Sequence, residues 1–249
     1  MKTRFRVTTL VALMAVAACD EAATEPRADD SVLDDDVAML AADVAQEDLE
    51  VMNSMLPSGI VGAPAASTVS DFSRHRTVEF FDTLGAEQDH YDRLATGSIH
   101  TVLEVAGEMS KEGFEWSLDR SRDMWVTGLG GEETERTWNG TGAEDRSRAR
   151  VLDNDAARTY DFTGTLLIED VVRGVPRDEN PWPLSGTITR NVTIEVTNGP
   201  NGDETITRLV VITFNGTQFV TMMVNDVEYD VDLAERGRHR IHRRHRNGG

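Results

Sequence analysis

The chain of 249 residues carries 44 aspartates and glutamates against 25 lysines and arginines, which gives a formal net charge of −19 at pH 7. It contains one cysteine, which excludes an intramolecular disulfide, so the folded part must be held together by its core. The excess of acid disfavours nucleic acid or anionic lipid as a partner of the main body.

The charge is unevenly distributed along the chain. All the acidic residues lie between Asp20 and Glu235, whereas residues 236–249 contain six arginines and no acid. The C-terminal tail is therefore a basic segment attached to an acidic body.

The first nineteen residues, MKTRFRVTTLVALMAVAAC, have the pattern of an export signal. Lys2, Arg4 and Arg6 precede an apolar run over residues 7–18, which is too short to span a bilayer as a mature helix. No later segment approaches 18 consecutive apolar residues. We therefore predict a signal peptide over residues 1–18 and no further membrane span.

The sequence Val16-Ala17-Ala18-Cys19 resembles the lipobox of bacterial lipoprotein precursors. This resemblance, which covers only the export segment, implies cleavage before Cys19 and acylation of that cysteine. It implies a location in the bacterial cell envelope, on the periplasmic face or in the outer membrane, with the membrane as a partner. The alternative is an ordinary signal ending in Ala-x-Ala, with Cys19 incidental.

A tether and one helix are expected before the folded body. Residues 19–30 are polar and lack periodicity, which is typical of a flexible tether. Residues 31–56 repeat apolar side chains at helical spacing, with Ser31 as the expected N-cap. This acidic amphipathic helix is expected to cover an apolar sheet face or, alternatively, to bind a partner. Residues 57–70 form a small-residue linker.

Residues 71–234 alternate apolar and polar side chains, which predicts a mainly β domain. Asn215-Gly216 is a strong hairpin signal, because both residues tolerate the positive φ of a tight turn. The expected fold is an antiparallel meander, arranged as a curled sheet, a barrel or a sandwich. The expected strands include separate segments at 114–118, 124–129, 135–139 and 147–152.

Two further patterns occur within the β domain. A Gly-Thr dipeptide recurs at residues 140, 164, 186 and 216, which we interpret as repeated hairpin chemistry. Arg146, Arg148 and Arg150 lie on one face of a predicted strand. They are expected to pair with acids across strands, or alternatively to contact an anionic ligand.

Catalytic signatures are missing from the sequence, which contains no G-x-S-x-G, H-E-x-x-H or phosphate-binding glycine motif. Acids and histidines cluster in the body only at Asp89-His90-Tyr91-Asp92, with His75 and His100 nearby in sequence. This loop is a candidate for metal binding or acid–base catalysis, against the simpler interpretation of a polar loop. No cofactor is expected.

The tail offers two candidate sites. Its arginines are candidates for binding envelope polyanions: Arg236, Arg238, Arg240, Arg243, Arg244 and Arg246. Its histidines are weaker candidates for a metal site: His239, His242 and His245. The third interpretation is a solvated tail without a ligand.

Together these features predict a lipid-anchored envelope protein with a β-rich binding or structural domain, and they favour binding over catalysis. One alternative is a carrier of lipids or lipoproteins in the periplasm, which would need an apolar cavity between helix and sheet. Another is an envelope hydrolase or metal-dependent enzyme that uses the Asp89-His90 loop, which would need converging polar side chains.

Overall fold

The computed structural model describes residues 28–54, 72–111, 114–151, 157–199, 202–235 and 240–244. The predicted signal peptide, Cys19, nearly all of the tether and the linker at 57–70 lie outside these residues. Within the described residues, no helix combines the length and the apolar character that crossing a bilayer requires.

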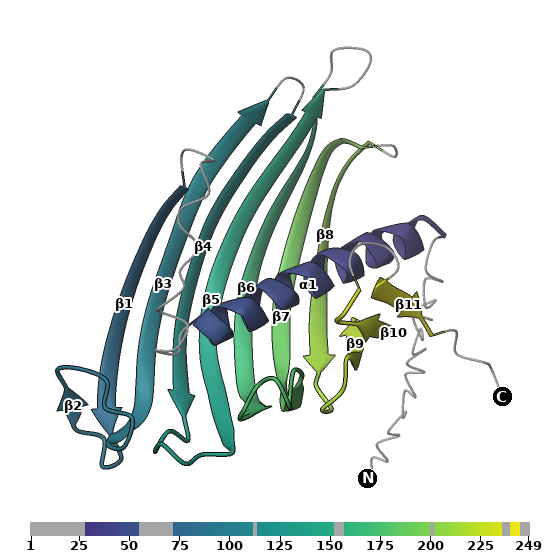
Figure 1. Ribbon diagram of the computed structural model, residues 1–249. Coiled ribbons are helices and arrows are strands. Elements are labelled where there is room, and N and C mark those ends of the chain that lie inside the picture. The colour runs from purple at the N-terminus through teal and green to yellow at the C-terminus, as the bar shows by residue number, and fades with distance from the viewer. Residues whose placement is uncertain are drawn as a thin grey trace, which may run out of the picture.

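The described residues form one helix and one sheet (Figure 1). The helix is α1 (Ala28–Ser54). The strands are β1 (Phe72–Asp82), β2 (Glu87–Gln88), β3 (Thr96–Lys111), β4 (Phe114–Thr127), β5 (Glu135–Val151), β6 (Ala157–Gly174), β7 (Pro183–Gly199), β8 (Gly202–Thr213), β9 (Phe219–Val224), β10 (Val227–Asp232) and β11 (Ile241–Arg243).

The sheet is an antiparallel meander in the order β11-β10-β9-β8-β7-β6-β5-β4-β3-β1-β2. Its two edges, at β11 and β2, do not pair with each other. The expected mainly β meander is thus confirmed, and of the three expected arrangements the curled open sheet is the one found. The helix begins at Ala28, so Ser31 lies within it, and its prediction as the N-cap is wrong.

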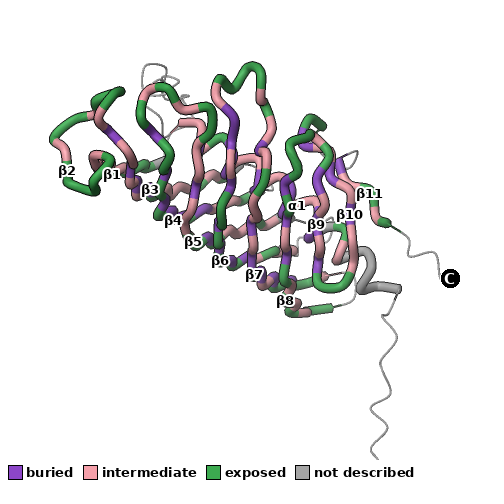
Figure 2. Tube along the Cα trace, turned by 90° about the horizontal axis from the view of Figure 1, so that it is seen from below, coloured by how far each residue is buried: buried purple, intermediate pink, exposed green. Residues whose placement is uncertain are grey.

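Helix α1 crosses one face of the sheet, which we call the inner face, and its first residues lie beside β9–β11 (Figure 1). Buried and exposed residues alternate along the strands (Figure 2), because successive side chains point to opposite faces. Inner-face residues of the sheet and the helix form one apolar core. The opposite, outer face is rich in Thr, Asp and Glu.

The helix presents small side chains to the sheet. Four alanines at helical spacing are at most 2% exposed: Ala38, Ala41, Ala42 and Ala45. Small side chains allow the helix backbone to approach the strands closely, which suits an interface of high packing density.

Strands β4 and β5 are continuous where the sequence indicated two strands each. In β4, Arg120 and Arg122 occupy inner-face positions between Leu118 and Met124, which hides the apolar alternation. In β5, the inner-face positions 140 and 142 are glycines, which also hides the apolar alternation. The division into short strands is therefore wrong at both places.

Three of the glycines within strands make room for long neighbouring side chains. A Cβ added to Gly140 would lie 2.8 Å from Met124 Cγ, and one on Gly142 would lie 2.8 Å from Arg122 Cδ. Gly164 lies against the ring of Phe162 in the same way. The hairpin interpretation of the Gly-Thr dipeptides is thus wrong for Gly140, Gly164 and Gly186, which lie inside β5, β6 and β7.

Replacing Gly142 with alanine should lower the free energy of unfolding by about 1–3 kcal/mol. The added Cβ would lie 2.6 Å from the backbone oxygen of Ser121, so the backbone must move. Urea denaturation measures the loss, with Gly130→Ala as control, because an added Cβ there meets no atom within 4 Å. Equal stability of the two variants would contradict this packing role.

Candidate functional site: an arginine cluster under the helix

Four arginines gather on the inner face beneath α1, and we call them the arginine cluster: Arg120 and Arg122 of β4, Arg146 of β5 and Arg190 of β7. The side chains of Arg122 and Arg190 are at most 2% exposed. Guanidinium groups remain charged in proteins, so burial at this level requires carboxylate partners.

Among the described residues, Glu144 of β5 is the one carboxylate of the sheet that contacts the arginine cluster. Its Oε2 accepts hydrogen bonds from Arg120 Nε at 2.9 Å and from Arg122 Nη2 at 2.8 Å. It also pairs with Arg146. Burial by itself would raise the pKa of Glu144, but the charges of Arg120, Arg146 and Arg122 lower it to about 2. Glu144 is therefore ionised at neutral pH.

Helix α1 supplies two more carboxylates from adjacent positions. Asp48 is fully buried, accepts a hydrogen bond from Arg122 Nε at 2.8 Å, and pairs with Arg190. Glu47 accepts a hydrogen bond from Arg146 Nη2 at 2.7 Å and pairs with Arg120. The helix thus neutralises a charge that the sheet alone leaves in excess.

Further contacts hold the helix along its length. Near its start, Asp34 accepts a hydrogen bond from Arg208 Nε at 2.6 Å, and Asp35 accepts one from Tyr229 Oη at 2.9 Å. Near its end, the backbone oxygen of Leu49 accepts one from Arg173 Nη1 at 3.2 Å. Several acidic residues of α1 therefore bind side chains of the sheet, while others face solvent.

Two arginines of the described tail residues form ion pairs with the body. Arg240 is fully buried, donates from Nη1 to Asp43 of α1 at 2.7 Å and also contacts Gln46. Arg244 pairs with Glu228 and Asp230 of β10. The segment between them forms β11, in which Arg243 is half-buried and His242 is exposed. The remaining candidates lie outside the described residues: Arg236, Arg238, Arg246, His239 and His245.

The histidines of the predicted enzyme site do not converge. Asp89 and His90 are exposed in the loop after β2, and His75 is exposed on β1. His100 of β3 instead contacts Glu79 and Asp123 on the outer face. Among the described residues, no group of three His, Cys, Asp or Glu side chains is placed to hold a metal. The geometry that the enzyme alternative requires is therefore not found there.

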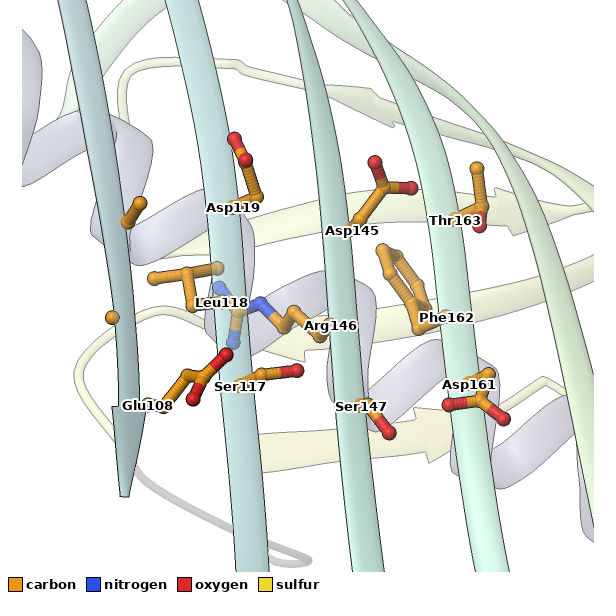
Figure 3. Close-up of a pocket in the computed structure, with 12 residues that line it drawn as sticks. Glu108, Ser117, Leu118, Asp119, Asp145, Arg146, Ser147, Asp161, Phe162 and Thr163 are labelled. Carbon is orange, nitrogen blue, oxygen red and sulfur yellow. The ribbon is translucent and has the colours of Figure 1, made fainter.

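A shallow depression of about 420 Å³ lies in the outer face over β3–β6 (Figure 3). Its walls carry four carboxylates: Glu108, Asp119, Asp145 and Asp161. Asp119 and Asp145 are direct cross-strand neighbours. Because like charges in this position repel, the depression is a solvated acidic surface, and we assign it no ligand.

His100 forms the other organised cluster of the outer face. Its ring stacks on Trp125 with centroids 4.5 Å apart. Its Nδ1 lies 2.8 Å from Glu79 Oε2, and its Nε2 lies 2.8 Å from Asp123 Oδ1. Partial burial lowers the pKa of His100, but the hydrogen bonds and charges of the two carboxylates outweigh it and raise the pKa above 6.5. Two ionised carboxylates require a proton on each ring nitrogen, so this arrangement favours the imidazolium form.

Replacing Asp123 with asparagine should lower the pKa of His100, because one of its two anionic partners is lost. A group with a raised folded pKa stabilises the fold at low pH, and that contribution is lost as pH rises through the folded pKa. NMR titration of the imidazole protons measures the effect, with the signal assigned through His100→Gln. A pKa at or below 6.5 in the unsubstituted protein would contradict the arrangement.

Comparison with known proteins adds no relative: no family model matches the chain, and neither a curated protein nor a solved structure matches it.

Proposed function

We propose that the protein is an exported, lipid-anchored binding protein of the bacterial cell envelope. Cys19 is the acylated residue in this proposal, and the β body is a binding or structural domain held at the membrane. The export-signal pattern that ends at Cys19 supports the anchor, and the arrangement of the body supports a particular orientation.

The start of α1 and the strand β11 lie at the same end of the sheet (Figure 1). Asp35, near the start of α1, contacts Tyr229 of β10, the strand that pairs with β11. Asp43, further along the helix, contacts Arg240, the residue before β11. Nine residues lead from Cys19 to Ala28 and reach at most about 30 Å. An acylated Cys19 would therefore hold this end of the sheet close to the membrane.

The same orientation brings the basic tail close to the membrane, because β11 is part of that tail. Polybasic segments close to a bilayer bind anionic head groups and add to the affinity of a lipid anchor. Arg240 and Arg244 are already paired with acids of the body, and Arg243 is half-buried in β11. This role therefore falls to Arg236, Arg238 and Arg246.

A binding role fits the inner face better than the carriage of an acyl chain. Helix side chains such as Ala41, Ala45 and Met52 fill the space over the sheet, and each is at most 2% exposed. A buried ionic network lies at the centre of this interface. Burying an acyl chain against these charges without a counter-ion is unfavourable, which argues against a simple lipid carrier.

Replacing Cys19 with serine should release the protein from the membrane. The unsubstituted chain, expressed in a bacterium with a lipoprotein pathway, should incorporate labelled palmitate and sediment with membranes. Cys19→Ser should do neither, and because Cys19 is the one cysteine, the label reports on that position alone. An unlabelled but membrane-bound parent chain would overturn the proposal.

The contribution of the tail is separable from that of the anchor. In the Cys19→Ser chain, changing Arg236, Arg238 and Arg246 to glutamine should abolish salt-sensitive binding to phosphatidylglycerol vesicles. This variant keeps Arg240 and Arg244, which the body uses. Unchanged vesicle binding would remove the anion role of the tail and leave the anchor in place.

A further inference from the structure

We propose that the inner face of the sheet is a receptor for an acidic amphipathic helix of a partner protein, and that α1 is a resident occupant which such a helix replaces. This inference rests on the proposed binding role of the body and is independent of the lipid anchor.

Charge is the first argument for a receptor. The arginine cluster presents four positive charges, and Glu144 is the single sheet carboxylate that contacts them among the described residues. The neutralising groups come from α1, from adjacent Glu47 and Asp48. Without the helix, the inner face is a cationic patch beside an apolar surface. Its complement is a segment with two neighbouring carboxylates next to an apolar stripe.

Shape is the second argument. The inner face has no side chains at three glycine positions, Gly140, Gly142 and Gly164. The buried alanines of α1 allow the helix to approach the sheet closely. A replacing helix therefore needs small residues at the spacing of Ala38, Ala41 and Ala45, followed by the two carboxylates. This requirement is narrower than a general preference for acidic peptides.

The way in which α1 is attached to the sheet allows another helix to replace it. The helix is held by side-chain contacts and by apolar packing, while every strand pairs with other strands. It can therefore leave without breaking the backbone hydrogen bonds of the sheet. The buried Arg190 Nε has no hydrogen-bond partner among the residues that the structure describes, so the described part of α1 leaves this cluster incompletely satisfied. Because desolvation offsets much of the attraction in buried ion pairs, such an interface gives more specificity than net stability.

A labelled peptide with the sequence of residues 28–54 tests the receptor on the full Cys19→Ser chain. The resident helix competes at an effective concentration of about millimolar, so the unsubstituted body should bind the peptide weakly. A chain carrying Glu47→Gln and Asp48→Asn should bind it at least about tenfold more tightly, because its own helix is weakened while the arginine cluster is intact. Glu50→Gln, an exposed change on the same helix, is the matched control and should behave like the parent.

The chemistry of the occupant is tested by the same chain with a second peptide. A peptide that itself carries Glu47→Gln and Asp48→Asn should bind about tenfold more weakly than the original. Equal binding of the two peptides, or binding of neither to a folded variant, would overturn the proposal. Displacement of the peptide by phosphatidylglycerol vesicles would also overturn it, because the inner face would then be a lipid site.

Hydrogen exchange of the parent chain gives an independent test that needs no variant. The amides of α1 should exchange through an opening that leaves the amides of β5–β7 protected. If α1 exchanges only with global unfolding, the helix is not replaceable and the proposal fails. Neither test uses the lipid, so a failure here differs from failure of membrane labelling at Cys19.

Discussion

Replacing Asp48 with alanine should lower the free energy of unfolding by about 3–5 kcal/mol, the typical loss when one partner of a buried ion pair is removed. Asp48 is fully buried, and its two oxygens contact Arg122 and Arg190. Without it, two guanidinium groups stay buried with no counter-charge from the helix. Urea denaturation of the Cys19→Ser chain, followed by circular dichroism, measures this loss.

The matched control is Glu50→Ala, two residues further along the helix on its exposed side. Alanine has high helix propensity, so this change should stay within about 0.5 kcal/mol of the parent. A loss of less than about 1 kcal/mol for Asp48→Ala would mean that the arginines find other partners. In that case the ionic network would not hold the helix.

Acid should destabilise the fold through Glu144, whose pKa of about 2 in the folded chain lies below its ordinary value of 4.5. A carboxyl group with a lowered pKa stabilises the fold above its unfolded pKa, and that contribution is lost as pH falls through the folded pKa. The difference corresponds to about 3 kcal/mol, lost between pH 4.5 and pH 2.

Urea denaturation between pH 6 and pH 2.5 tests this on the parent and on Glu144→Gln. The variant should be less stable at pH 6 and should lose less stability towards acid, because the titrating group is gone. Glu195→Gln, an exposed change on the outer face of β7, should keep the pH dependence of the parent. Parallel curves for the parent and Glu144→Gln would show that Glu144 is not the group responsible.

Much of the fold follows from local patterns. Alternation of apolar and polar side chains predicted the antiparallel meander, and helical spacing predicted α1 to within three residues at its start. Both patterns arise because one face of each element is buried, which is a property of short segments. The choice of a curled open sheet depends on how the edges meet, which no short segment determines.

The arginine cluster was missed because its partners lie far apart in the sequence. Arg190 and Asp48 are separated by 142 residues, and each looks like a solvated charge by itself. Arg146 was expected to pair with acids across strands, but its partners are Glu144 on its own strand and Glu47 on the helix.

Some signal for the cluster was nevertheless present. Arg120 and Arg122 occupy the same face of β4 as Leu118 and Met124, at a spacing of two residues. Asp48 interrupts the apolar stripe of the helix between Ala45 and Met52. Charged residues on two separate apolar faces, with opposite signs, indicate that the two faces meet.

A double-mutant cycle between Asp48 and Arg190 tests most directly the central claim that the carboxylates of α1 neutralise the arginines of the inner face. The cycle compares the unfolding free energies of Asp48→Asn, Arg190→Met, the double variant and the parent. If the two groups form a buried pair, the coupling energy should be about 2–3 kcal/mol. A coupling energy below about 0.5 kcal/mol would contradict the account, because the two changes would then act independently.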